Sequence, residues 1–230
     1  MMRRLMRMLG TALIVVGVAM LGWAFATWRW EDPLTSLYTT YEQRKLDDRL
    51  DERFAAYRGR TSTPASDDAS ISVDARDYRR EAREGDGIGR ITVPQLGLRM
   101  AFVYGVDPDS LKRGPGLHPR TFVPGQGELV YIAGHRTTYG APFSRIDRLR
   151  KGDRITLEMP YGTFVYSVTG NRVVTSDNMS VLRSRGYEQV ALQACHPRFF
   201  ASHRWITYGR LVDRAPPPSA AEAFEEGLTQ

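Results

Sequence analysis

The sequence LQACHP, residues 192–197, closes a strand-like run and contains the only cysteine of the protein. Apolar residues alternate with small or polar ones over 188–194, which is the pattern of a strand with one buried face. Cys195 therefore lies at the C-terminal end of a strand, and a second strand-like run follows at 205–212. If the two strands pair antiparallel, Cys195 and Arg204 meet at the mouth of one hairpin.

The side chains around this cysteine suit thiol-based acyl transfer. A lone cysteine cannot form an internal disulfide, so its thiol is either buried for packing or used in chemistry. Arg204 can stabilise the oxyanion of a tetrahedral intermediate, but a pKa above about 12 prevents it from acting as a base. His135, which follows the strand-like run 129–133, is the leading candidate for the acid and the base. The competing interpretations are a hydrogen-bonded turn histidine and an ordinary surface arginine.

Short strand-like runs broken by turn signals fill the rest of this region. They cover 88–93, 99–104, 128–133, 153–158 and 163–169, in addition to the two around Cys195. Many short strands at this spacing favour an antiparallel barrel or sandwich, so we expect one mainly β domain over 86–214. Residues 110–112 and 143–149 are predicted to form brief helical turns.

The N-terminus predicts a membrane anchor. Three arginines lie within residues 1–8, and residues 9–28 contain no charge. Such a run is long enough to cross a hydrocarbon core of about 30 Å. Because positive charge favours the cytoplasmic side, we expect a single pass through the cell membrane, with residues 1–8 in the cytoplasm and the domain outside. A cleaved signal peptide is the alternative.

Residues 29–85 are expected to connect the anchor to the domain. Apolar residues recur at three-, four- and five-residue steps, so 29–58 is predicted to contain an amphipathic juxtamembrane helix. That helix could lie on the membrane, pair with another copy or dock on the domain. Residues 59–85 and 215–230 are poor in large apolar side chains, so they are predicted to be a flexible linker and a disordered tail.

The chain carries a formal net charge of +6 at pH 7. Attraction to an anionic cell envelope and a merely solvated basic surface both explain this charge. Nucleic acid is not expected as a partner, because a domain outside the cell rarely meets it.

A longer series of motifs resembles the sortase family, especially its actinobacterial class E. The segment GHRTTYGAPF, residues 134–143, is similar to the histidine motif of that family. The other matching segments are ITVP at 91–94, LKRGPGLHPRT at 111–121, GD at 152–153, GTFVY at 162–166, and CHP at 195–197 followed by Arg204. They occur in the family's order over about 86–212, which is nearly the whole domain.

The resemblance implies a closed eight-stranded β-barrel and a cell-surface cysteine transpeptidase of the Gram-positive type. Cys195 would attack the carbonyl after threonine in a Leu-Pro/Ala-x-Thr-Gly sorting signal at the C-terminus of a secreted protein. Arg204 would stabilise the oxyanion and bind the signal, while His135 would protonate the leaving glycine amine and deprotonate the incoming amine. The acceptor would be an amine of a peptidoglycan precursor or of a pilin. No cofactor and no metal are expected.

The resemblance also suggests residues that contact the sorting signal. Tyr139, and more weakly Thr138, follow the histidine and are expected to line the groove for the signal. Thr175 and Leu182 belong to the loop 172–186, which would cover the signal. These four assignments rest on position in the sequence.

The residue before the nucleophile bears on the choice between functions. Many sortases have threonine there, and Ala194 in this chain would lose an accessory hydrogen bond near the oxyanion. A binding-only sortase homologue with weak catalysis is therefore one alternative. A pilin-polymerising sortase is another, although EDPL at 31–34 lacks the aromatic residue of that class's lid motif. A zinc site from Cys195, His196 and His203 is disfavoured, because structural zinc usually takes four ligands and this spacing matches no finger.

Overall fold

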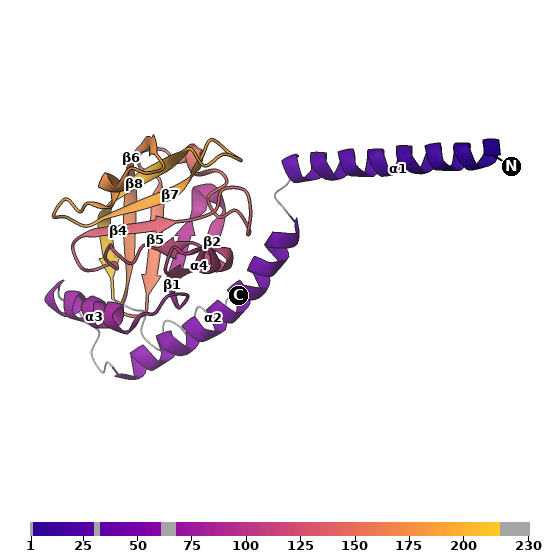
Figure 1. Ribbon diagram of the computed structural model, residues 1–230. Coiled ribbons are helices and arrows are strands. Elements are labelled where there is room, and N and C mark those ends of the chain that lie inside the picture. The colour runs from indigo at the N-terminus through magenta and orange to yellow at the C-terminus, as the bar shows by residue number, and fades with distance from the viewer. Residues whose placement is uncertain (1, 30–32, 61–67, 217–230) are drawn as a thin grey trace.

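The computed structural model describes residues 2–29, 33–60 and 68–216, and its eight strands close into a barrel (Figure 1). The strands are β1 (Gly87–Val93), β2 (Leu98–Tyr104), β3 (Gly116–Leu117), β4 (Leu129–Ala133), β5 (Arg154–Met159), β6 (Gly162–Thr175), β7 (Gln189–His196) and β8 (His203–Ala215). Around the barrel they follow the order β1-β2-β3-β4-β7-β8-β6-β5. The closed eight-stranded barrel expected from the sequence is confirmed.

Helical segments precede the barrel and connect its strands. They are α1 (Met2–Arg29), α2 (Pro33–Arg60), α3 (Asp68–Glu81) and α4 (Pro108–Arg113), with the 3-10 segments η1 (Pro94–Leu96), η2 (Ile146–Arg148) and η3 (Met179–Leu182). Both α4 and η2 fall where brief helical turns were predicted. Asp107 caps α4, because its carboxylate accepts hydrogen bonds from the first-turn N–H groups of Asp109 and Ser110.

The strands that matter for function are β4, β7 and β8. β4 and β7 pair in parallel through the register Leu129↔Gln189 to Ala133↔Gln193, while β7 and β8 form an antiparallel hairpin. Parallel neighbours end at the same edge of a sheet. The C-terminal ends of β4 and β7 therefore meet at one end of the barrel, and the hairpin mouth of β7 and β8 lies there as well.

Two apolar clusters lie on opposite faces of this part of the sheet. Alternate residues of β7, including Val190, Leu192 and Ala194, point into the main core inside the barrel. A smaller cluster covers the outer face of β4, β6, β7 and β8, and consists of Leu129, Tyr131, Val174, Ala191 and Ile206. Val181, Leu182 and Tyr208 pack against this outer cluster. The segment η3 therefore lies over the outer face that β4, β6, β7 and β8 share.

Helix α2 docks on the barrel, which settles where the juxtamembrane helix lies. Leu46 and Leu50 are fully buried in a cluster with Ala101 and Val103 of β2. The side-chain amide of Gln43 donates to the carbonyl oxygen of Ala101 at 3.0 Å and accepts from the N–H of Ala101 at 2.8 Å. Along β2, the short β3 pairs only with Val103 and Tyr104, so Gln43 satisfies the backbone groups of Ala101 that β3 does not reach.

The predicted linker 59–85 contains a packed helix, and that part of the prediction is wrong. In α3, Ile71 and Ala75 are buried in the main core, and the hydroxyl of Tyr78 donates to the carbonyl oxygen of Ile88 at 3.0 Å. The composition of the segment is polar on average, but these three residues lie on one helical face and bury enough surface to order it. Residues 61–67 lie outside the described residues.

The two ends of the chain bear on the remaining expectations. The stretch Met2–Ala24 of α1 is long and apolar enough to cross a membrane, and none of it is buried against the protein. At the other end, β8 continues to Ala215. The rest of the predicted disordered tail, 217–230, lies outside the described residues.

Candidate active site

Cys195 and Arg204 face each other across the β7–β8 hairpin. The antiparallel register pairs Cys195 with Arg204, as the sequence pattern predicted, and β6 adds Val174 opposite Arg204. Directly opposed residues of antiparallel strands point to the same face. Cys195, Arg204 and Val174 therefore form one row across three strands. This row continues the outer apolar cluster that contains Val174.

His135 reaches the same end of the barrel from β4. The last β4–β7 pair is Ala133↔Gln193, and the N–H of Gly134 donates to the carbonyl oxygen of Gln193 at 2.9 Å. The parallel register therefore brings His135 out of β4 at the level of Cys195. Gly134 is required here, because a Cβ atom at this position would lie 2.6 Å from the ring of Phe143.

The environment of His135 favours the neutral imidazole. The ring is half-buried, and burial lowers the pKa of His135 below its usual value of 6.5. Its Nε2 atom is buried and has no hydrogen-bond partner among the residues that the structure describes. No hydrogen bond from this part of the protein therefore fixes the proton on Nε2.

Arg204 carries its charge along the outer face. Its guanidinium donates to the carbonyl oxygens of Ala201 at 2.7 Å and His203 at 3.0 Å, which anchors it to the β7–β8 loop. Burial raises the pKa of Tyr131 well above its usual value, and the positive charge of Arg204 opposes part of that rise. The positive charge of Arg204 therefore acts on the outer apolar cluster, which contains Tyr131. A negative charge that formed on a bound substrate there would be stabilised.

Arg136, which the sequence analysis did not single out, holds the end of the strand that carries Cys195. Its side chain is only 4% exposed and donates to the carbonyl oxygen of Cys195 at 3.2 Å. The same guanidinium lies 3.0 Å from Nδ1 of His196 and forms an ion pair of 3.1 Å with Asp147. Arginine is common on this chain's surface, so only the fold distinguishes this buried one.

The structure separates the predicted signal-contacting residues. Leu182 packs on the outer cluster, which also contains Val174 of the row with Cys195, and its contact with a signal stays a prediction. Thr175 is exposed and pairs with His203, one step beyond Val174, so its side chain points to the other face. Val174, and not Thr175, lies on the outer face beside Arg204. The alternation of side chains along β6 could have shown this from the sequence.

The expectation for Ala194 needs correction. Its side chain is fully buried in the main core, because Ala194 and Cys195 are neighbours on a strand and point to opposite faces. A side chain at this position faces away from the outer groove, so any contact of residue 194 with a bound signal must come from its backbone.

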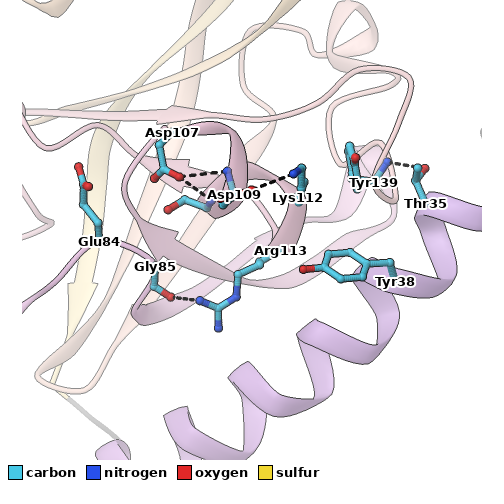
Figure 2. Close-up of a pocket in the computed structure, with 10 residues that line it drawn as sticks. Thr35, Tyr38, Glu84, Gly85, Asp107, Asp109, Lys112, Arg113 and Tyr139 are labelled. Carbon is cyan, nitrogen blue, oxygen red and sulfur yellow. Dashed lines mark hydrogen bonds and ion pairs between the residues drawn. The ribbon is translucent and has the colours of Figure 1, made fainter.

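Tyr139 and Thr138 belong to the loop after His135, and Tyr139 lies toward α2. The ring of Tyr139 is 5.1 Å from that of His135, and 6.4 Å from that of Tyr38 in an edge-on contact. Its N–H donates to the hydroxyl of Thr35 at 2.9 Å (Figure 2). Its φ of 54° is unusual for a large residue, and α2 supplies the contact that holds it. Thr138 accepts from the N–H of Ala141 and so closes the turn.

No group of three or more metal-ligating side chains occurs in the described ranges 2–29, 33–60 and 68–216. His196 and His203 are paired across β7 and β8, but Cys195 points to the other face of that hairpin. The three side chains do not converge.

Comparisons with known proteins agree with this geometry. A family model described as the Sortase domain matches residues 91–212. Sortase D of Bacillus subtilis (strain 168) is 26% identical over 164 residues, which are 70% of this chain and 80% of that relative. Two solved structures are also similar. A Clostridium perfringens Sortase D5 transpeptidase has a TM-score of 0.61 at 22% identity, covering 75% of this chain and 99% of the other. Sortase E1 from Streptomyces coelicolor, with a tripeptide in its active site, has a TM-score of 0.54 at 27% identity, covering 57% and 91%.

Proposed function

The chain belongs to the sortase family of cysteine transpeptidases, and from that membership we propose that it cleaves a Leu-Pro/Ala-x-Thr-Gly sorting signal between threonine and glycine. Cys195 attacks the threonine carbonyl, the glycine amine leaves, and the acyl group remains on the sulfur as a thioester. An amine of a cell-wall precursor then takes the acyl group. A thioester suits this exchange because it keeps the carbonyl activated between the two steps.

The observation that carries this proposal is the meeting of three chain segments at one end of the barrel. Cys195 and Arg204 are paired across β7 and β8, and His135 leaves β4 at the same level. Arg204 stabilises the oxyanion. His135 donates a proton to the leaving glycine amine and later accepts one from the incoming amine, as one group must do in the two directions of acyl transfer.

The outer cluster supplies the place for the signal. Its apolar floor includes Val174, which shares a row with Arg204 and Cys195, and Leu182 of η3 packs against it. The leucine and the proline or alanine of the signal bind on this floor, with the threonine carbonyl at the sulfur. The structure of Sortase E1 contains a tripeptide in its active site. We infer a signal of the class E type with alanine at the second position, although D and E names both occur among the similar proteins.

We infer that the enzyme acts outside the cell. The stretch Met2–Ala24 of α1 can cross a membrane by length and composition, and the arginines that precede its apolar run favour a cytoplasmic N-terminus. The barrel then meets secreted proteins and cell-wall precursors on the outer surface.

The test uses the full chain in detergent, because α2 packs on the barrel and belongs with it. Quenched peptides containing Leu-Ala-x-Thr-Gly or Leu-Pro-x-Thr-Gly are incubated with the protein and an added amine. Mass spectrometry should find cleavage between threonine and glycine, a thioester on Cys195 and an amide product. All three should vanish in Cys195→Ala, and the better peptide identifies the signal.

Two results would count against the proposal. Tight binding of both peptides without any thioester would favour a binding-only homologue. Transfer to a lysine of a pilin-like protein, with none to small peptide amines, would favour a pilin polymerase.

A further inference from the structure

A cavity of about 660 Å³ lies between α2, α4 and the loop that carries His135 (Figure 2). Thr35 and Tyr38 of α2 form one side, and Tyr139 of the histidine loop forms another. Its lining includes neither Cys195 nor the residues of the outer apolar cluster. The cavity is therefore separate from the groove assigned to the sorting signal.

Tyr139 is the wall that this cavity shares with the catalytic histidine. Its ring lines the cavity, and its centre lies 5.1 Å from the centre of the His135 ring. The Thr35 hydroxyl and the edge of the Tyr38 ring hold Tyr139 from the side of α2. Through Tyr139 the cavity therefore borders His135, whereas none of the residues of the outer apolar cluster lines it.

The lining holds three carboxylates, those of Glu84, Asp107 and Asp109, and two cations, Lys112 and Arg113, which is an excess of one carboxylate. Lys112 forms an ion pair of 2.8 Å with Asp109, and Arg113 forms one of 3.1 Å with Glu42. These contacts occupy the two cations of the lining.

Two further carboxylates remain. Glu84 is exposed at one end of the cavity, and no ion pair involves it within the described part of the chain. Asp107 accepts from the N–H groups of Asp109 and Ser110, and the Ser110 side chain is the main cause that lowers the pKa of Asp107. The cavity therefore attracts cations and presents two tyrosine rings.

We propose that this cavity is the docking site of the acceptor, a peptide that arrives as a primary ammonium ion. This inference rests on the proposed function and assigns a site to its second substrate. Primary amines have pKa values of about 8 to 10, so they are cations at neutral pH. The carboxylates of Glu84 and Asp107 concentrate such a cation beside the loop that carries His135, as clefts of one charge do for oppositely charged substrates.

In the second step of the reaction, the acyl group passes from the sulfur of Cys195 to the acceptor amine. The ammonium passes Tyr139 and gives one proton to neutral His135, which makes the nitrogen nucleophilic. The nitrogen attacks the thioester carbonyl, the C–N bond forms and the C–S bond breaks. The second proton of the nitrogen passes to the departing sulfur, which restores the thiol. An acceptor that is uncharged at neutral pH gains nothing from the carboxylates of Glu84 and Asp107, so its transfer should not depend on them.

The decisive variant is the double substitution Glu84→Gln and Asp107→Asn in the full chain in detergent. Asparagine caps a helix as well as aspartate does, so α4 is kept while the charge is removed. The acceptors are triglycine, Nα-acetyl-lysine amide and hydroxylamine, which is uncharged at neutral pH. The charge-matched control is Asp48→Asn with Glu52→Gln, since both residues are exposed on α2 and neither lines the cavity.

For the cationic acceptors, we expect kcat/KM of the double variant to fall about fivefold or more. Hydrolysis and transfer to hydroxylamine should stay unchanged, and about 0.5 M salt should remove most of the difference. The control variant should behave as the natural chain. Equal losses for hydroxylamine and triglycine, or no loss for either cation, would overturn the proposal.

A binding measurement keeps this test independent of catalysis. Triglycine and Nα-acetyl-lysine amide are titrated into Cys195→Ala and followed by the NMR signals of labelled tyrosine rings. Saturable shifts that disappear after Glu84→Gln and Asp107→Asn support the site even if no thioester forms with any peptide. Absence of saturable binding of both amines overturns the site even if the enzyme proves to be a transpeptidase. The tighter-bound amine shows whether the acceptor uses an α-amine or a side-chain amine.

Discussion

The guanidinium of Arg136 donates a hydrogen bond to the carbonyl oxygen of Cys195 at 3.2 Å, across 59 positions of the sequence. Arg136 directly follows His135, so one side chain links the histidine loop to the end of the nucleophile strand. Its ion pair with Asp147 anchors it on the other side. The positions of the imidazole and the thiol are therefore set by one shared support.

Replacement of Arg136 should affect catalysis more than peptide binding. Arg136→Lys keeps the charge but loses the planar fork that reaches three partners. We expect the rate of thioester formation to fall about tenfold, because small misplacements of reacting groups are costly. KM for the peptide should change little, and Arg136→Met should be slower than Arg136→Lys. Single-turnover mass spectrometry measures both quantities, with Arg145→Lys, an exposed residue of the same loop, as control. An increase in KM at constant rate would mean that Arg136 supports the groove instead.

Replacement of Arg204 tests the oxyanion assignment. Arg204→Met should slow thioester formation by about 10²–10³, the usual cost of removing one oxyanion donor. Arg204→Lys should recover only part of that loss, since a point charge lacks the fixed fork of arginine. The matched control is Arg210→Met, an exposed arginine further along β8. If Arg204→Lys matched the natural chain, charge alone would explain the function of this residue.

The pH dependence of deacylation should report His135. Burial lowers the pKa of His135 below 6.5, and the neutral imidazole is the form that accepts a proton from the attacking nucleophile. Hydrolysis of a preformed thioester should therefore rise with pH, show its inflection below 6.5 and level off above it. His196, which follows Cys195, also has a pKa below its usual value. Burial is the main cause, and the positive charge of Arg136 is the second. His196→Gln should keep the inflection whatever its rate, while His135→Gln should abolish it. An inflection above 6.5 would contradict the buried, neutral histidine.

Helix α2 should contribute to the stability of the barrel. Leu46→Ala removes a fully buried side chain between α2 and β2, and such substitutions cost about 2–5 kcal/mol. Leu37→Ala, on the same helix at 68% exposure, is the control and should change little. Thermal unfolding of the full chain in detergent compares the two. Equal midpoints for both variants would show that α2 is detached in solution.

Local patterns predicted the parts of the site that belong to single strands. Alternation over 188–194 placed Cys195 at a strand end, and antiparallel pairing then placed Arg204 opposite it. The same alternation also puts Ala194 on the other face, and the family resemblance obscured that consequence. Periodicity was similarly available for α3, where three apolar residues at helical spacing were hidden by a polar average.

Long-range contacts were not accessible from the sequence. The parallel pairing of β4 with β7 joins strands that are far apart in the chain, and Arg136 becomes distinctive only when that pairing buries it. Tyr139 looked like a groove residue by its position after the histidine. Its actual place against α2 depends on Thr35, about a hundred residues earlier.

The hydrogen bond between Thr35 and Tyr139 also limits the distance between the end of α1 and the loop that carries His135. Thr35 lies six positions beyond Arg29, the last residue of α1, and six residues of chain reach at most about 20 Å. In the proposed orientation, the loop that carries His135 would therefore lie close to the outer surface of the bilayer. A fully released protein in the medium would rarely reach it. Under the proposed function, the expected substrates are therefore those that are still held at the membrane.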